Sequence, residues 1–428
     1  MTLSWGQIAR LGQVQMALGA IVVLTTSTLN RLMVVEFALP ALLPGALVGL
    51  HYGIQLSRPR WGFTCDTGGN RTRWIIGGMA ILAAGGIGAA FAVTMFAQNF
   101  ALAIALSIIS YGLIGIGVGA SGTSLLALLA TATAPDRRAA AATITWLMMI
   151  FGIALTAGLA GQFLDPYSPQ RLITVVAVIS TLALLLTTLA IGKIESRVTP
   201  MRPEAPTPFM HGLREVWSEP KTRNFTLFVF LSMNAYFMQE LILEPYAGLV
   251  FGFTPGQSTS LSGAQNGGVF IGMLTVGIMA TGLKIGALRT WVMAGCLGSC
   301  AVLTLICMTG FADTALNFTY LVIALGFFNG MFAVAAIGAM MALASQGRGQ
   351  REGTRMGLWG AAQAIAAGFG GLTGAVLVDV ARTFAPDGPA FGAVFTFEAT
   401  LFLAAALMAA RVMETPQATM PATLVPGE

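Results

Sequence analysis

The chain has 428 residues, of which 56% are hydrophobic and only 9% are charged. A soluble domain usually carries about 25% charged residues, so this composition excludes an ordinary water-soluble protein and is typical of helices that face lipid. The formal net charge is +5, but its arrangement along the chain reflects membrane topology and gives no reason to propose nucleic-acid binding.

The first apolar run follows a short polar start, Met1 to Gly12. No small-residue cleavage site comes after this run, so we expect it to be retained as a helix and not removed as a signal. A membrane-spanning helix needs about 20 mostly apolar residues. Twelve segments meet this requirement, at 13–35, 38–57, 74–97, 100–130, 140–163, 171–192, 224–250, 262–283, 290–310, 317–344, 356–378 and 390–411.

The basic residues indicate the direction in which these spans run. If both termini are cytoplasmic and each span reverses the chain, all of the 22 Lys and Arg residues lie on the cytoplasmic side except Arg31, Arg171 and Arg382. This is the positive-inside pattern of membrane proteins. It supports an even number of spans and a multi-pass protein of a bacterial inner membrane.

A polar stretch from Lys193 to Arg223 divides the chain between the sixth and the seventh span. It predicts an N-terminal six-helix half at 1–192, a cytoplasmic linker at 193–223, a C-terminal six-helix half at 224–412 and a tail at 413–428 that we expect to be disordered. Within the linker, His211 to Trp217 forms either a short amphipathic helix on the membrane surface or part of a plain solvated segment, and both interpretations stay open.

The two halves share spaced residues in the same order. Asn30 of the first span is followed six positions later by Glu36 and then by a proline, and Asn234 of the seventh span is followed six positions later by Glu240 and then by a proline. Two glycines, a basic loop and a tryptophan also recur at nearly the same spacing, as Gly115, Gly119 and Trp146 and as Gly326, Gly330 and Trp359. These matches predict two related halves.

The loop after the second span carries the sharpest motif. It fits G-x3-D-x2-G-x-[RK]-x-[RK], with Gly62, Asp66, Gly69, Arg71 and Arg73 at the defined positions. Glycine permits a tight turn, and an aspartate can accept hydrogen bonds from a helix N-terminus or an arginine, so we expect a structural or gating role. The pattern resembles the cytoplasmic loop signature of the major facilitator superfamily. That resemblance implies an all-α membrane protein of twelve transmembrane helices in two pseudo-symmetric six-helix halves.

Polar side chains at membrane depth are costly and are therefore candidates for function. The candidates for ligand binding are His51, Asn30, Glu36, Gln239, Glu240, Glu244 and Asn329, and further polar groups in the spans are Gln265, Asn266, Gln363 and Glu398. Glu240 and Glu244 lie four residues apart and share one helix face. Arg31 can pair with Glu36 or with those two glutamates across the halves. This structural pairing is the favoured interpretation, and ligand or proton binding is the alternative.

No catalytic or metal-binding constellation is evident in the sequence. The four cysteines, Cys65, Cys296, Cys300 and Cys307, form no CxxC pair and have no zinc-type spacing, so we expect free thiols. Zinc-protease, nucleotide-binding and nucleophile motifs are absent. We therefore predict no catalytic residues, no protein-bound metal or nucleotide, and a protein that is not an enzyme.

A family resemblance is carried by three stretches of the chain, residues 25–41, residues 57–73 and residues 119–124 with the basic loop that follows. They resemble the PucC/LhaA family of the major facilitator superfamily, and the resemblance extends over nearly the whole chain up to Arg411. Members of this family occur in photosynthetic bacteria, are associated with the assembly of light-harvesting complexes and are thought to deliver bacteriochlorophyll. Some have been described loosely as bacteriochlorophyll synthesis proteins.

The resemblance implies a membrane assembly factor for light-harvesting and reaction-centre complexes, with bacteriochlorophyll as its cargo. The implied partners are the lipid bilayer, antenna and reaction-centre polypeptides and pigment-synthesis enzymes. The implied location is the inner, intracytoplasmic membrane, with both termini in the cytoplasm. His51 is the only membrane-embedded histidine and the first candidate ligand for the pigment's Mg²⁺, which takes N or O donors. A histidine that is hydrogen-bonded within the bundle is the favoured alternative.

Two other functions stay open. A secondary transporter would move a small solute together with protons and would use Glu240 and Glu244. A subunit of a pigment-synthesis enzyme is the weaker alternative, because the sequence shows no acid, base or cofactor constellation. A non-catalytic role in bacteriochlorophyll synthesis is compatible with the assembly function.

Overall fold

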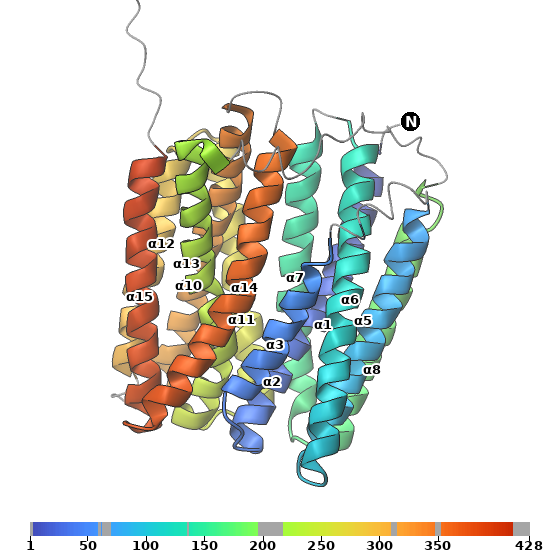
Figure 1. The fold of residues 1–428 in the computed structure, drawn as a ribbon, viewed down its shortest axis with the longest axis vertical. Coiled ribbons are helices and arrows are strands. Elements are labelled where there is room, and N and C mark those ends of the chain that lie inside the picture. Colours follow the sequence, from blue (N-terminus) through green and yellow to red (C-terminus); the bar gives the residue numbers. More distant parts are fainter. Residues whose placement is uncertain are drawn as a thin grey trace, which may run out of the picture.

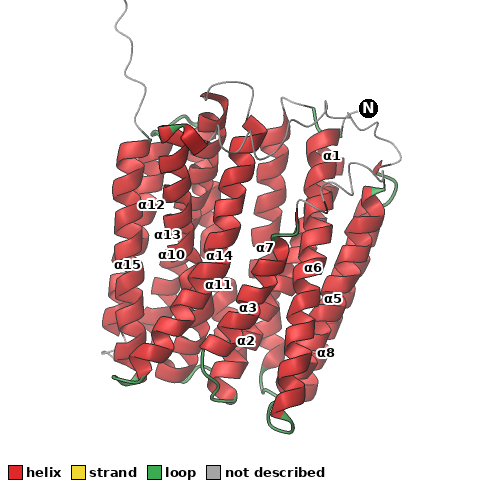
Figure 2. Cartoon of the chain, in the orientation of Figure 1, coloured by secondary structure: helices red, strands yellow, loops and turns green. Residues whose placement is uncertain are grey.

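A computed structural model describes residues 3–58, 61, 70–134, 137–195, 217–309, 315–346 and 352–413 of the chain. In these residues long helices lie side by side and are joined by short turns (Figure 1). No strand occurs in the described ranges (Figure 2). The elements are α1 (Trp5–Val23), the π-helical η1 (Leu24–Thr28), α2 (Leu29–Arg31), the π-helical η2 (Leu32–Glu36), α3 (Leu42–Gln55), α5 (Arg71–Thr94), α6 (Phe100–Ala132), α7 (Arg138–Leu164), α8 (Pro169–Ile191), α10 (Pro220–Phe251), α11 (Pro255–Val276), the π-helical η5 (Gly277–Gly282), α12 (Leu288–Thr309), α13 (Ala315–Gln346), α14 (Glu352–Arg382) and α15 (Asp387–Val412).

The predicted fold class is confirmed in the part of the chain that the structure describes. Eleven helical segments there are long and apolar enough to cross a membrane, and they match eleven of the twelve predicted spans. The remaining prediction, 38–57, corresponds to α3, which has 14 residues and begins only after the turn that contains Pro40. The described chain is thus an all-α, multi-pass membrane protein with twelve spans, one of them short.

The first span begins earlier than predicted, at Trp5 and not at residue 13. Ser4 accepts a hydrogen bond from the backbone N–H of Gln7, and the Gln7 side chain accepts one from the Ser4 N–H. This capping box provides partners for backbone donors that a helix start otherwise leaves free. Ile8 and Leu11 are completely buried. Residues 5–12, predicted from the sequence to be part of a polar start before the first span, therefore form the first turns of a packed helix.

Apolar side chains form two large clusters, one on each side of the predicted linker. The first cluster consists of residues from α1 to α8 together with Leu241 of α10, and the second consists of residues from α10 onward. Since each cluster draws nearly all its members from one side, each set of helices has its own core. The boundaries predicted for the halves stay a prediction.

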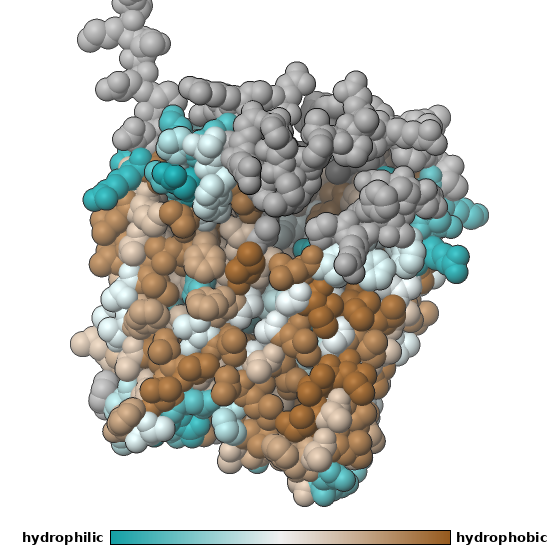
Figure 3. Space-filling model, viewed as in Figure 1, coloured by the Kyte–Doolittle hydropathy of each residue, from teal (hydrophilic) through white to brown (hydrophobic). Residues whose placement is uncertain are grey.

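The two ends of the bundle have different connections. We call the end at which α1 begins and α15 ends the linker end, and it lies at the top of Figure 1. The opposite end, which holds the turns at 37–41, 165–168, 252–254 and 383–386, we call the turn end. On the visible face, apolar side chains cover the middle and polar ones gather toward both ends (Figure 3), as expected of helices that cross a bilayer. The cytoplasmic position of the linker end stays a prediction.

The loop motif is only partly described. Three of its residues lie outside the described ranges, Gly62, Asp66 and Gly69. Its arginines, Arg71 and Arg73, lie in the first turn of α5 at the linker end. The carboxylate of Glu195 accepts hydrogen bonds from the backbone N–H groups of Arg71 (2.9 Å) and Thr72 (2.7 Å), so an acid at the start of the predicted linker caps this helix.

Two more predictions fall outside the described residues. The first is the proposed amphipathic turn His211–Trp217, of which only Trp217 lies within the described residues. The second is the tail predicted to be disordered, of which only Met413 is described.

Candidate functional site

The first span is irregular where it carries its polar residues. Two π-helical segments, η1 and η2, flank the single turn α2, and π-helical turns are often found at functional sites. Four successive hydroxyl side chains, those of residues 25–28, make up most of η1, and each is at most 4% exposed. A polar stretch of the first span therefore faces the protein interior.

These hydroxyls meet polar residues of the second half. We call the group the polar seam, and it consists of Thr26, Ser27, Thr28, Asn30 and Arg31 of the first span, Glu240 and Glu244 of α10, and Ser258, Thr259 and Ser262 of α11. The hydroxyl oxygens of Ser27 and Ser262 are 3.0 Å apart, as are those of Thr28 and Thr259. The Thr26 hydroxyl donates to Oε1 of Glu240 at 3.2 Å. The polar seam thus links the first span to both α10 and α11.

The Asn30 side chain provides a hydrogen-bond donor for a backbone carbonyl of α10 that lacks its helical partner. Pro245 lies inside that helix and has no N–H, so the carbonyl of Leu241, four residues earlier, has no helical donor. The Nδ2 group of Asn30, which is 1% exposed, donates to this carbonyl at 2.6 Å. Freed backbone groups at membrane depth need such partners, so the contacts of Asn30 are structural.

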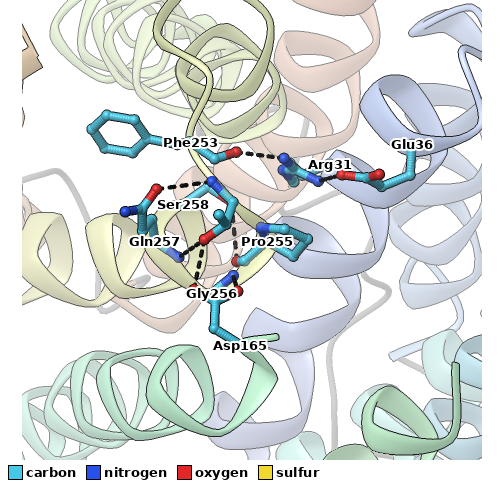
Figure 4. Close-up of polar contacts among 9 residues, drawn as sticks. Arg31, Glu36, Asp165, Phe253, Pro255, Gly256, Gln257 and Ser258 are labelled. Atoms are coloured by element: carbon cyan, nitrogen blue, oxygen red, sulfur yellow. Dashed lines mark hydrogen bonds and ion pairs between the residues drawn. The ribbon is translucent and has the colours of Figure 1, made fainter. Parts of the chain in front are cut away.

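Arg31 forms the local ion pair that the sequence left open. One of its guanidinium nitrogens lies 2.5 Å from Oε1 of Glu36, and another donates to the backbone carbonyl of Phe253 at 2.6 Å (Figure 4). The Arg31 side chain is 2% exposed and that of Glu36 is 37% exposed. The pair lies toward the turn end, where Arg31 also fastens the first span to the turn before α11.

Glu244 and Gln239 of α10 hold buried oxygen atoms without hydrogen-bond partners. Glu244 is 2% exposed and Gln239 is 1% exposed. Neither carboxylate oxygen of Glu244 makes a hydrogen bond, and Oε1 of Gln239 makes none. The Glu244 carboxylate faces Arg31 and the hydroxyls of Ser27 and two α11 serines, but at no standard hydrogen-bond geometry. Burying polar groups without partners is costly, so these two side chains are candidates for ligand contact close to the contacts between the halves.

His51 is hydrogen-bonded within its own helix, as the favoured interpretation expected. Its Nε2 lies 2.9 Å from Nε2 of Gln55, and Oε1 of Gln55 accepts a hydrogen bond from Arg58. The Gln55 amide group must then donate, which makes His51 Nε2 the acceptor. His51 is 2% exposed and its Nδ1 has no partner. The centroid of its imidazole ring lies 4.8 Å from that of the Tyr52 ring.

Asn329 has its contact within the second half and not in the polar seam. Its Oδ1 accepts a hydrogen bond from Ser299 of α12 at 2.8 Å, while its Nδ2 has no partner. Glu398 of α15 is also completely buried with two unpartnered oxygens. Asn266 lies beside the seam, and its side chain donates to the backbone carbonyl of Ser262 at 3.0 Å. The structure therefore brings Asn30, Glu240 and Glu244 together among the predicted site residues.

Sequence reasoning missed the hydroxyl side of the site. The four hydroxyls of residues 25–28 entered only as part of the stretch that carries the family resemblance, and those of Ser258, Thr259 and Ser262 were not singled out. Ser and Thr are common in membrane helices because they can bond to their own backbone, as Thr25 does to the Val22 carbonyl at 2.8 Å. The available signal was the unbroken run of four hydroxyl residues at 25–28. Four successive side chains point in different directions around a helix, so some of these hydroxyls must face neighbouring helices.

Comparison with known sequences gives a consistent picture. A model of the family described as "PUCC protein" matches residues 28–417. The "Bacteriochlorophyll synthase 44.5 kDa chain" of Rhodobacter capsulatus is 63% identical over 429 residues, covering 100% of both chains. "Protein PucC" of Cereibacter sphaeroides is 28% identical, and the match covers 92% of this chain and 89% of the relative.

Comparison with solved structures supports the fold. A bacterial homologue of the human lysosomal transporter Spinster, in an inward-facing and unoccupied conformation, is 14% identical with a TM-score of 0.66, covering 96% of each chain. The peptide transporter POT in complex with sulfate is 15% identical with a TM-score of 0.69, again covering 96% of each chain. At these identities the likeness concerns the fold alone, which is that of the major facilitator transporters.

Proposed function

Since the chain belongs to the PUCC protein family, we propose that it is a membrane assembly factor for photosynthetic light-harvesting and reaction-centre complexes. The role in photosynthesis rests on one observation above the others, the 63% identity to the "Bacteriochlorophyll synthase 44.5 kDa chain" over both full lengths. Every described helix, including the residues of the polar seam, lies within that match. The proposed partners are antenna and reaction-centre polypeptides and the enzymes that make the pigment.

The proposed cargo is bacteriochlorophyll. This pigment is large and apolar, and its Mg²⁺ needs at most one further hard N or O ligand. Oε1 of Gln239 and the carboxylate of Glu244 are buried oxygens that no protein donor occupies, and either supports one contact to the Mg²⁺. Nδ1 of His51 is the next candidate, because its Nε2 is already engaged by Gln55.

The proposal is tested by gentle purification of the protein from photosynthetically grown cells, followed by an absorption spectrum and identification of co-purifying subunits. We expect bound pigment together with antenna or reaction-centre polypeptides. The variants Gln239→Leu and Glu244→Leu should lose pigment. Glu398→Gln, which changes an equally buried carboxyl of the second half, is the matched control and should keep it. A colourless preparation without partners would contradict the proposal.

Transport of a small solute with protons is the second candidate function. It is favoured by the position of Glu240 and Glu244 on one face of α10, in a polar seam that links the two halves. Ionisable groups inside a membrane often belong to proton relays. Substrate-dependent flux in vesicles, abolished by Glu244→Gln and retained in Glu398→Gln, would favour transport over assembly.

We propose a non-catalytic contribution to bacteriochlorophyll synthesis. The name of the 63% identical relative includes the word synthase, so an enzymatic link needs its own test. A deletion strain should assemble fewer complexes while it keeps active pigment-synthesis enzymes. Accumulation of one specific biosynthetic intermediate in that strain would instead point to a subunit of an enzyme.

The proposed location is the inner, intracytoplasmic membrane, with both termini in the cytoplasm. The positive-inside distribution of Lys and Arg supports this orientation, and α1 begins at the same end of the bundle at which α15 ends (Figure 1). Reporter fusions at the two termini should both report the cytoplasm. Reporters in opposite compartments would contradict an even number of spans.

A further inference from the structure

A carboxylate that follows the fifth helix of the first half binds the start of the second helix of the second half. Asp165 comes directly after α7. Its Oδ2 accepts a hydrogen bond from the Thr254 hydroxyl at 2.6 Å, and its Oδ1 accepts one from the backbone N–H of Gly256 at 3.1 Å (Figure 4). Thr254 is the N-cap of α11. An anion at this position satisfies free N–H groups and interacts favourably with the helix dipole.

Asp379 makes the corresponding contact in the opposite direction. It lies in the last turn of α14, in the second half. Its Oδ1 accepts a hydrogen bond from the backbone N–H of Ala41 at 2.9 Å, and its Oδ2 accepts one from that of Leu42 at 2.6 Å. Ala41 is the N-cap of α3, in the first half. Both oxygens of each aspartate are therefore used on one helix start of the other half.

The two contacts correspond under the repeat that relates the halves. Counted along the described chain, α7 and α14 are the fifth spans of their halves, and α3 and α11 are the second spans. The turn before each second span also contains one residue in the left-handed region, Ala38 with φ 49° and Gly252 with φ 68°. Each turn ends near a proline, Pro40 or Pro255. A shared geometry at equivalent places indicates one device that occurs twice.

Both contacts lie at the turn end, at the rim of the bundle. The residues around them are partly accessible, since Thr254 and Leu42 are exposed. Water can therefore replace the helix N–H groups as a partner for either carboxylate, and the net cost of separation is much smaller than for polar groups buried in hydrocarbon. At the linker end, by contrast, the hydrogen bonds from Arg10 to the carbonyls of Leu189 and Gly192 stay within the first half.

We propose that Asp165 and Asp379 are paired clamps that hold the two halves closed at the turn end, and that this end opens when both are released. The proposal does not depend on which cargo the protein handles. Each clamp is a charge-assisted contact to a helix start. Replacing aspartate by asparagine removes the charge and turns one of the two acceptor oxygens into a donor, which at Asp379 must face a helix N–H group. Each substitution therefore weakens the closed state while it preserves side-chain size.

Distance measurements between spin labels test the clamps directly. The labels are placed on exposed turn-end positions of the two halves, Gln170→Cys and Phe384→Cys, in a chain whose four native cysteines are replaced by alanine. The parent should show a single distance, that of the closed state. Asp165→Asn and Asp379→Asn should each raise the ratio of a longer distance to the closed-state one by about tenfold, as expected when a charge-assisted hydrogen bond is lost. The double variant should raise it further.

The matched control removes a helix cap within one half at the same end. Asn99→Ala deletes the acceptor for the backbone N–H of Leu102 at the start of α6, and it should leave the label distance unchanged. A folded double variant with the parent's distance distribution would overturn the proposal, and so would an equal opening in Asn99→Ala. If the double variant does not fold, the two single variants decide, because absence of the longer distance in both contradicts the clamps.

Discussion

The two places where the halves cross, α7 against α11 and α3 against α14, share a carboxylate clamp but differ in what packs behind it. At the first crossing backbone meets backbone, since a Cβ added to Gly263 would lie 2.5 Å from the nitrogen and 2.8 Å from the Cα of Gly158. At the second crossing a Cβ added to Gly45 would lie 2.8 Å from the Cβ of Ala375. The second crossing is thus made by a small side chain.

This difference shows that two crossings with the same polar contact can differ in how tightly their helices pack. The Cβ of Ala375 is fixed to its own backbone and cannot move by changing rotamer, so both crossings resist an added methyl group. The first crossing is the tighter one, because an added Cβ meets three atoms within 3.0 Å at Gly263 and one at Gly45. The first crossing also continues toward the linker end, where Phe151 and Phe270 pack at 5.7 Å and a small cluster around Ile150 joins α7 to α11. We therefore expect the first crossing to resist separation more strongly than the second.

The largest effect should come from filling the tighter crossing. Gly263→Ala should lower the free energy of unfolding by about 2–3 kcal/mol and Gly45→Ala by about 1 kcal/mol, because overpacking costs more where the added Cβ meets three atoms within 3.0 Å than where it meets one. Unfolding of the purified protein in mixed detergent measures both values. Gly49→Ala, where an added Cβ meets nothing within 4 Å, is the control. Equal losses at Gly263 and Gly45 would remove the distinction between the crossings.

The polar seam between the crossings is tested by Glu244→Leu. Replacing a buried carboxyl that has no hydrogen bond by an apolar side chain should raise the free energy of unfolding by about 1–2 kcal/mol and lower the amount of assembled complexes in cells, since sites kept for function are often destabilising. Thermal unfolding and the absorbance of membranes give the two readouts. Glu240→Leu should raise the free energy of unfolding by less than Glu244→Leu does, because Glu240 accepts a hydrogen bond from Thr26 that the substitution removes. A destabilised Glu244→Leu would mean that this carboxyl supports the fold.

The turns before α3 and α11 can be compared by substituting the one residue in each that has a positive φ, Ala38 and Gly252. Ala38→Gly should stabilise the protein by about 1 kcal/mol and Gly252→Ala should destabilise it by a similar amount, because a side chain at positive φ is strained and glycine is not. Thermal unfolding of both variants beside the parent provides the measurement. Opposite signs are required; a loss in both variants would show that packing and not backbone strain decides at these turns.

The smallest expected effect concerns a single hydroxyl pair across the halves. A double-mutant cycle with Ser27→Ala and Ser262→Ala should give a coupling free energy of about 0.6 kcal/mol, as is usual for hydrogen bonds between membrane helices. A second cycle that combines Ser27→Ala with Ser299→Ala, whose serine bonds Asn329 within the second half, should give no coupling. Coupling in the second cycle alone would contradict the contact between Ser27 and Ser262.

Predictions about single helices agree closely with the structure. The span predicted at 171–192 is α8 at Pro169–Ile191, and the span predicted at 290–310 is α12 at Leu288–Thr309. Hydropathy is a sum over about 20 neighbouring residues, so the signal needs no knowledge of tertiary packing. The largest differences lie at the starts of the first and eighth spans, predicted at residues 13 and 262 but found at Trp5 and Pro255. In both places a capping box, at Ser4 or at Thr254, sets the boundary.

Predictions about contacts succeeded only at short range. The pair of Arg31 and Glu36 joins residues five positions apart and could be foreseen, whereas the contact of Asp379 with Ala41 joins residues 338 positions apart. Asp379 follows the predicted span 356–378 and looks like an ordinary acid of a loop. Nothing in its neighbours along the chain indicates that a helix start of the other half lies within hydrogen-bond distance.

Composition, span spacing and the spread of positive charge were enough to identify a helical membrane protein of twelve spans, because lipid acts on each stretch of chain independently of the others. The family resemblance was also available from short stretches of residues. Packing alone settled which polar groups matter: Asn30 is matched to the carbonyl freed by Pro245, and Glu244 is left without a hydrogen bond. Those outcomes depend on which helix faces lie opposite each other, and hydropathy along one helix carries no information about its neighbour.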